Sequence, residues 1–216
     1  MNPKARDLPL FTLNSVLFPG ATMPLQVFEQ RYKHMITDCL NEDSQFGIVL
    51  IQSGSEVGLP AVPYSVGTLA KIVQCHKVRE DRFFLSVEGR EPFKIIKINQ
   101  QRPYLSAEVK FLDSDSEEEL PASRVDDIRS KVIGYYRMLL GLRGGWARKL
   151  EIPHGLVILS YFIAGILQIS AHEKQKFLEE SSPLNRIDLG LEFLEREMFV
   201  LRPRIASELL KNTSRQ

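Results

Sequence analysis

Residues 8–32 of this chain read LPLFTLNSVLFPGATMPLQVFEQRY, and this stretch decides the fold class. Two apolar runs, 8–13 and 23–28, stand on either side of a segment that holds Pro19 and Gly20. Short runs rich in β-branched and aromatic residues that end at Gly, Pro or Asn are typical of β-strands. The stretch therefore predicts two strands joined by a loop.

The spacing of apolar residues changes after the second strand. Apolar side chains recur there at helical spacing, at Phe28, Tyr32, Met35, Ile36, Cys39 and Leu40. We expect this side of the helix, with Phe28 and Tyr32 at its start, to fill the core. The polar side chains fall on the other side. The sequence thus predicts one helix that plugs or caps a β-structure.

Further strands are predicted along the first half of the chain, at 46–52, 67–78, 82–88, 92–99 and 104–112. Each of these segments alternates or runs apolar, and a hairpin turn is expected at 79–82. Together with the first two they make seven short strands, which is the pattern of a small barrel or sandwich.

An acidic stretch, DSDSEEE at 113–119, separates the two halves of the chain. It has no apolar member and is typical of a linker or of an acidic helix start. Beyond it the apolar spacing becomes 3.6 residues, which predicts about four helices, including a buried one in the strongly apolar run 156–169. We therefore predict an α+β fold with a β-barrel lobe at 1–116 and an α-helical bundle lobe at 117–216.

Two helix starts in the second half carry local signals. Ser170 stands three residues before Glu173, which is the spacing of a capping box. Ser182 and Pro183 are interpreted as the N-cap and the first-turn proline of a long helix. Pro203 is expected to kink or shorten that helix, because proline gives no backbone N–H.

The charges of the chain almost cancel, since 28 Lys and Arg stand against 27 Asp and Glu and the formal net charge is +1. Such a balance gives no strong field toward nucleic acid or an anionic membrane. Cys39 and Cys75 have no partner at ligand spacing and are interpreted as free thiols of a reducing compartment. The N-terminus lacks a signal-peptide core, and 156–169 is shorter than the roughly 20 residues of a spanning helix. We expect a cytoplasmic protein without a membrane partner.

Motifs for catalysis are missing or incomplete. The glycine-rich stretch 141–145 is not followed by Lys-Ser or Lys-Thr, so it is not a phosphate-binding loop. His172 and Glu173 begin as a zinc-binding H-E-x-x-H motif does, but Lys176 occupies the position of the second histidine. A G-x-S-x-G nucleophile elbow is also absent from the sequence. The sequence predicts a non-catalytic protein with no metal site and no cofactor.

A basic and aromatic region lies between residues 129 and 149. Its basic residues are Arg129, Lys131, Arg137, Arg143, Arg148 and Lys149, with Tyr135, Tyr136 and Trp146 among them. Such a region can bind phosphates and stack bases, which keeps RNA binding as an alternative function. The preferred interpretation is a helix whose basic face meets the acidic stretch 113–119.

Short motifs in order along the chain carry a resemblance to a known family. They are LPLF (8–11), VLFPG (16–20), MPL (23–25), VFEQRY (27–32), FGIV (46–49), VGTLAKI (66–72), LSVEGR (85–90), FKI (93–95), YLSAEV (104–109), EKQ (173–175) and LE (178–179). In order and spacing they resemble the N-terminal substrate-binding domain of Lon proteases, over nearly the whole chain.

The resemblance implies a fold and a role. The implied fold is a pseudo-barrel similar to PUA domains, followed by a helical bundle. The implied role is to recognise unfolded or tagged polypeptide segments and to present them to a protease. In Lon proteases an ATPase and a Ser-Lys protease follow this domain, so a chain that ends at Gln216 is expected to be a free-standing bacterial form. One such form would be an adaptor for a separate protease.

The substrate-binding residues are expected on the outward side of the helix that starts at Phe28, because a rigid helix presents a site well. They are Gln30, Arg31, Lys33, His34 and Thr37. Arg31 keeps two open roles. It either contacts the substrate or, together with Glu29, fixes the helix against the barrel, and we prefer the second role.

Overall fold

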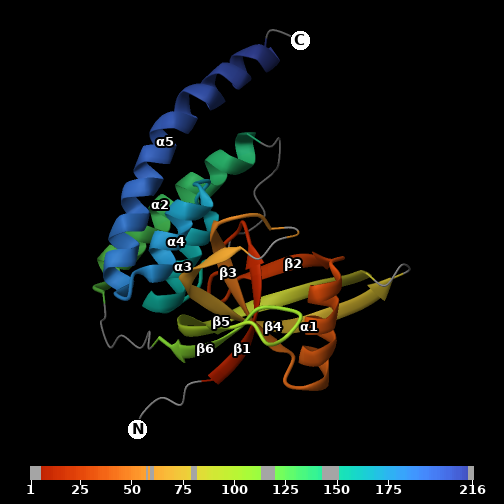
Figure 1. The fold of residues 1–216 in the computed structure, drawn as a ribbon. Helices are drawn as coiled ribbons and strands as arrows, with labels where there is room; N and C mark the ends of the chain where they lie inside the picture. Colours follow the sequence, from red (N-terminus) through yellow and green to blue (C-terminus); the bar gives the residue numbers. More distant parts are fainter. Residues whose placement is uncertain are drawn as a thin grey trace. The chain divides into compact units, whose positions relative to one another are not determined.

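The computed structural model describes residues 6–56, 58, 61–78, 82–112, 120–142 and 151–213. Within these residues the structure has one sheet of six strands, and the helix α1 (Gln30–Asn41) lies between the second and third strands in the chain (Figure 1). The strands are β1 (Arg6–Leu13), β2 (Thr22–Val27), β3 (Gln45–Ser53), β4 (Val62–Val78), β5 (Arg82–Asn99) and β6 (Ser106–Phe111). A mixed α and β architecture was predicted, and it is present.

The strand β5 differs from the prediction, because the two segments expected at 82–88 and 92–99 form one continuous strand. Its pairing with β4 carries on through a register shift between Thr68 and Ala70, so no turn is needed near Gly89. Gly89 marks a close approach instead. A Cβ at this position would lie 2.2 Å from the Phe18 carbonyl oxygen, and only glycine leaves room for that backbone.

The length of β5 lets the sheet close on itself. Its first half pairs with β2 and its second half with β6, while β4 pairs along most of its length. β6 also pairs with β1, β1 with β3, and β3 with β4. β5, β4, β3, β1 and β6 thus form a ring. β2 pairs with β5 alone among the described strands and stays at an open edge.

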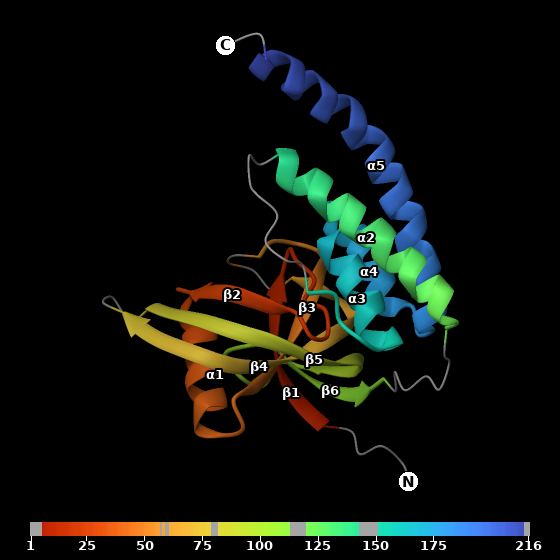
Figure 2. The same cartoon turned by 180° about the vertical axis from the view of Figure 1, so that it is seen from behind.

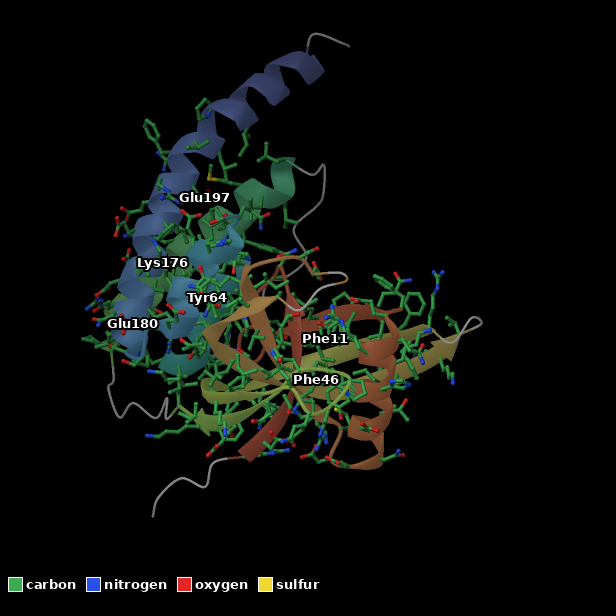
Figure 3. All side chains as sticks on the ribbon, viewed as in Figure 1. Phe11, Phe46, Tyr64, Lys176, Glu180 and Glu197 are labelled. Atoms are coloured by element: carbon green, nitrogen blue, oxygen red, sulfur yellow. The ribbon has the colours of Figure 1, made fainter. Side chains whose placement is uncertain are left out.

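The interior of the sheet holds two clusters of buried apolar side chains. In the larger one α1 contributes Tyr32 and Met35, and the Tyr32 ring stacks on Phe11 with centroids 4.0 Å apart. The ring centroids of Phe46 and Phe11 lie 6.0 Å apart, and both side chains are labelled in Figure 3. The smaller cluster surrounds Phe93, which has no exposed surface.

Two compact units divide the chain, and one of them is discontinuous. The β-unit contains Met1–Asp113 and also Ser170–Ser181, whereas the prediction placed everything after 116 in the helical lobe. The helix α4 (Ala171–Glu179) belongs with the sheet because Gln175 Nε2 donates to the Val66 carbonyl oxygen of β4 at 3.0 Å. Its predicted capping box is present, with Glu173 N donating to Ser170 Oγ at 3.2 Å.

The helical unit contains α2 (Ala122–Leu142), α3 (Leu156–Ile166) and α5 (Pro183–Thr213), and α5 lies along the other two (Figure 2). α5 begins at Pro183 as predicted but continues through Pro203. Its Arg186 is fully buried; Nε donates to Ser160 Oγ at 2.8 Å and the guanidinium lies 3.8 Å from the Tyr161 ring centroid. None of the helices described is long and apolar enough to cross a membrane.

Candidate functional site

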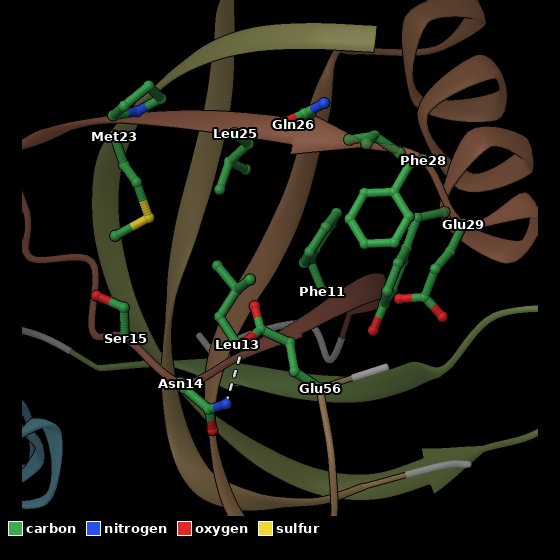
Figure 4. A pocket seen from close by; sticks show the side chains of 13 residues that line it. Phe11, Leu13, Asn14, Ser15, Met23, Leu25, Gln26, Phe28, Glu29 and Glu56 are labelled. Atoms are coloured by element: carbon green, nitrogen blue, oxygen red, sulfur yellow. Dashed lines mark hydrogen bonds between the residues drawn. The ribbon is translucent and has the colours of Figure 1, made fainter. Parts of the chain in front are cut away.

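An apolar groove of about 590 Å³ opens in the β-unit beside β2 (Figure 4). Apolar side chains from β1, from β2 and from the residue after β2 line it. They are Phe11, Leu13, Met23, Leu25, Val27 and Phe28. Asn14, Ser15, Glu29 and Glu56 add polar atoms. The groove has the size and the mostly apolar lining of a typical ligand site.

The exposure of Phe28 corrects the prediction that this side chain fills the core. Phe28 is 51% exposed and lines the groove. The helix starts only at Gln30, with Glu29 in extended conformation as its N-cap. Phe28 therefore lies before the helix, and helical spacing does not place it on the buried face. The predicted core face is confirmed for Tyr32, but Leu40 at its other end is 39% exposed.

Arg31 ties the start of α1 to the segment around Glu56. Its Nη2 lies 3.1 Å from Glu29 Oε2 and donates to the Glu56 carbonyl oxygen, also at 3.1 Å. Its guanidinium lies 4.6 Å from the centroid of the Tyr32 ring. The backbone N–H of Gly58 donates to Glu29 Oε2 at 3.4 Å. These contacts join the start of α1 to the segment at Glu56 and Gly58, and whether Arg31 is structural or contacts substrate stays a prediction.

The other predicted site residues lie on α1 outside the groove. Gln30, His34 and Thr37 are exposed, as expected for the outward side, and Lys33 is half-buried. The Gln30 amide Nε2 lies 3.3 Å from His34 Nε2, and Thr37 Oγ1 donates to the Lys33 carbonyl oxygen at 2.9 Å. Because none of them lines the groove, their binding role stays a prediction.

A smaller cavity of about 240 Å³ lies on another side of Tyr32, where Arg31 and Arg102 line it. The Tyr104 hydroxyl connects two charged groups here. It donates to Asp38 Oδ2 at 2.7 Å and accepts from Arg102 Nη1 at 2.9 Å. Burial and the Asp38 carboxylate raise the pKa of Tyr104, so this hydroxyl stays protonated at neutral pH.

The predicted basic region is only partly within the described residues. Arg143, Arg148 and Lys149 lie outside them, as do the acids at 113–119. Arg129 Nη2 lies 2.8 Å from His154 Nδ1, and Arg137 is exposed. Lys131 Nζ lies 3.0 Å from Glu195 Oε1 of α5 and 3.6 Å from Asp127 Oδ2, which raises its pKa. Lys131 thus meets acids of the helices themselves.

A metal site needs several His, Cys, Asp or Glu side chains close together. Within the described part of the chain no group of three or more such residues could hold a metal ion. His172, from the incomplete zinc motif, instead meets the Tyr64 ring edge to face, with centroids 5.9 Å apart. This exposed histidine thus makes an aromatic contact with the half-buried Tyr64 ring.

Residues 7–196 match the family described as the ATP-dependent protease La (LON) substrate-binding domain. The chain belongs to this family, and the resemblance noted in its sequence is confirmed. The match covers the β-unit, including the groove, and most of the described helices.

Individual relatives and solved structures agree with this assignment. The chain is 31% identical to the Lon protease of Anaeromyxobacter dehalogenans and 30% identical to Lon protease 2 of Myxococcus xanthus, over 202 residues in each case. These alignments cover 90% of this chain but only 24% of either relative, so the chain spans about a quarter of their length. It matches the non-catalytic N-terminal domain of these proteases.

Among solved structures, the Lon N-terminal domain protein from Xanthomonas campestris gives a TM-score of 0.66 at 28% identity, covering 87% of this chain and 98% of that chain. The N-terminal domain of the Mycobacterium avium complex Lon protease gives 0.61 at 18% identity, covering 88% and 98%. The second likeness concerns the fold alone.

Proposed function

We propose that this chain is a non-catalytic module that binds unfolded or tagged protein segments in the groove beside β2. The observation that carries the proposal is Phe28, a large aromatic side chain that is half exposed at an apolar groove. Phe28 belongs to a contiguous apolar lining together with Met23 and Leu25, and contiguous apolar surfaces, unlike single exposed apolar residues, mark interaction sites. Membership of a substrate-binding domain family supports the same role.

The chemistry of the groove suits a polypeptide better than a small polar ligand. Phe28, Met23 and Leu25 offer contact area for apolar side chains, and burying such area is the main favourable term in association. The sulfur and unbranched chain of Met23 adapt to different partners. A binder of unfolded chains needs such tolerance, because its substrates share apolar composition and no fixed sequence.

Binding of an unfolded test protein, with Phe28 replaced, tests the proposal. The probe is reduced, carboxymethylated α-lactalbumin carrying a fluorescent label, and the readout is anisotropy. Phe28→Ser should weaken binding about tenfold, roughly 1.4 kcal/mol, because interface energy concentrates in few aromatic side chains. Phe199→Ser is the matched control, since Phe199 on α5 is 80% exposed. Equal affinities for wild type and Phe28→Ser would refute the groove.

The outward side of α1 is a second candidate surface for the same role. It carries Gln30, Lys33, His34 and Thr37, and the paired exposed side chains Gln30 and His34 support it. Replacing both by Ala should weaken binding about tenfold if this face contacts substrate. The two variants, Phe28→Ser and the Gln30/His34 double mutant, therefore assign the site to the groove, to the helix face or to both.

The proposal also includes a cellular compartment and a partner protease. The free thiols of Cys39 and Cys75 support a reducing cytoplasm, and the closed sheet supports the PUA-like comparison. Action as an adaptor for a separate ATP-dependent protease is part of the same proposal, supported by the relatives being Lon proteases. RNA binding gains no support from the comparisons.

A further inference from the structure

The groove follows the free edge of β2. Five consecutive residues, Met23 to Val27, line it. Successive side chains of a strand point to opposite faces, and here Met23, Leu25 and Val27 are more buried than their exposed neighbours Pro24 and Gln26. A groove in contact with all five cannot lie on one face. It therefore runs along the edge, where the backbone of β2 has no strand partner among the described residues.

Pro24 indicates which backbone groups of β2 point toward the groove. It stands opposite Ser86 in the antiparallel pairing with β5. Opposite residues in such a pairing alternate between bonded and non-bonded pairs, and proline fits the non-bonded kind because it has no N–H to give. Thr22 and Gln26 each lie two residues from Pro24, so they too belong to non-bonded pairs. The N–H groups of Thr22 and Gln26 and the carbonyls of all three then point to the open edge.

The charge of the groove is negative. Among the described residues that line it, Glu29 and Glu56 are acidic and none is Lys or Arg. Glu29 is paired with Arg31 outside the lining, whereas the Glu56 carboxylate accepts a bond from the neutral Asn14 amide at 3.0 Å. A bound segment with a basic residue near Glu56 gains an opposite charge there, while an acidic one is repelled.

From these observations we propose that the bound segment is extended, apolar and flanked by a basic residue, and that it adds to the sheet as a strand beside β2. This deepens the proposed function and rests on it. A polypeptide backbone is the occupant because only it repeats donors and acceptors at the spacing of Thr22, Pro24 and Gln26. Its apolar side chains lie beside Phe28, and its basic residue lies near Glu56.

Backbone methylation of a peptide probe tests the strand addition. The probe is a labelled peptide, Lys-Thr-Leu-Thr-Leu-Thr-Lys, whose alternation fixes one register. N-methylation at single central positions should weaken binding at least tenfold at every second residue and less than about twofold between them. The Thr positions are sensitive if the peptide runs antiparallel to β2, and the Leu positions if it runs parallel. A flat response, or equal losses everywhere, overturns the proposal.

A pair of variants tests the same bonds from the protein side. Gln26→Pro removes the outward N–H and should weaken binding about tenfold, while Gln26→Ala, which keeps the N–H and loses only side-chain contacts, should weaken it by less than about twofold. A Gln26→Pro protein that fails to fold would show that this N–H bonds to β5, and this overturns the assigned phase. Glu56→Gln should remove the preference for Lys-ended over Glu-ended peptides; a preference that persists overturns the charge assignment.

The outcomes separate this inference from the proposed function. If peptides bind wild type and lose affinity in Phe28→Ser, but the methylation response is flat, the groove binds polypeptides by side chains alone. Strand addition is then wrong and the proposed function stands. If no peptide and no unfolded protein binds the wild-type chain, both are wrong.

Discussion

The two edges of the sheet differ in how they end. At one edge β6 folds back onto the second half of β5, so every strand there has neighbours and Phe93 is fully enclosed. At the other edge β2 pairs, among the described strands, on one side only, and Phe28 is half exposed beside it. The same kind of side chain thus serves stability at the closed edge and is available for binding at the open one.

Matched substitutions of these two phenylalanines should give the largest contrast. Phe93→Ala empties the enclosed cluster and should lower the free energy of unfolding by about 3–5 kcal/mol, because a cavity remains. Phe28→Ala should lower it by less than about 1 kcal/mol, as at surface positions. Urea unfolding followed by circular dichroism measures both. Comparable losses would show that the groove is part of the core.

Gly89 forms backbone hydrogen bonds with the segment that leads into β2. Its replacement should give the next largest loss in the free energy of unfolding. Its carbonyl oxygen accepts from Gly20 N and its N–H donates to the Ala21 carbonyl oxygen, both at 2.9 Å. In Gly89→Ala the new Cβ meets the Phe18 backbone, which should cost about 2–3 kcal/mol. Gly134→Ala is the control, because that helical position is open and alanine favours helix. A Gly89→Ala protein as stable as wild type would contradict this close packing.

The Thr68 side chain bonds to the same segment, and its replacement should lower the free energy of unfolding by less than that of Gly89. Its buried Oγ1 donates to the Leu17 carbonyl oxygen at 2.6 Å. Thr68→Val keeps the shape but leaves that carbonyl without the bond, for a loss of about 1–3 kcal/mol. Thr68→Ser, which keeps the hydroxyl, should lose less. The thermal unfolding midpoint of the three proteins gives the order, and a reversed order would refute the role of the bond.

The reactivity of the two thiols distinguishes the enclosed part of the sheet from its more accessible part. Burial, together with Glu42, Asp43 and Asp38, raises the pKa of Cys39 to about 12, so below that pH the thiol stays protonated and unreactive. Cys75, on β4, is only partly buried. At pH 8 a disulfide reagent should modify one thiol of the folded protein, and Cys75→Ser should abolish this reaction. Reaction of Cys39 at a similar rate would indicate frequent opening of the sheet.

Local patterns in the sequence predicted most elements of this fold, but not the continuity of β5 or the place of α4 in the β-unit. The capping box at Ser170 and the start of α5 at Pro183 follow from residues within one turn of each other, and both predictions are confirmed. The continuity of β5 depends on its register with β4, so local patterns predict two segments, 82–88 and 92–99, in place of one strand. The assignment of α4 to the β-unit depends on Gln175 reaching Val66, which is far away in the chain.

The site shows the same limit. Helical spacing identified the buried side of α1, but it placed the start of the helix at Phe28, two residues before its observed start at Gln30. The extended conformation of Glu29 could not be read from the spacing, because Phe28 fits either end of a strand or the start of a helix. The groove itself arises where β2 has no second partner among the strands that the structure describes, and this is a property of the whole sheet.

The discontinuous β-unit has a consequence for synthesis on the ribosome. The bond between Gln175 and the Val66 carbonyl joins residues 109 positions apart, and α4 follows most of the helical unit in the chain. At about 5–20 residues per second, Gln175 emerges about 5–22 seconds after Val66. During this interval the Val66 carbonyl oxygen has no hydrogen bond from Gln175. The nascent β-unit is therefore expected to become resistant to proteases only after Ser181 has left the exit tunnel.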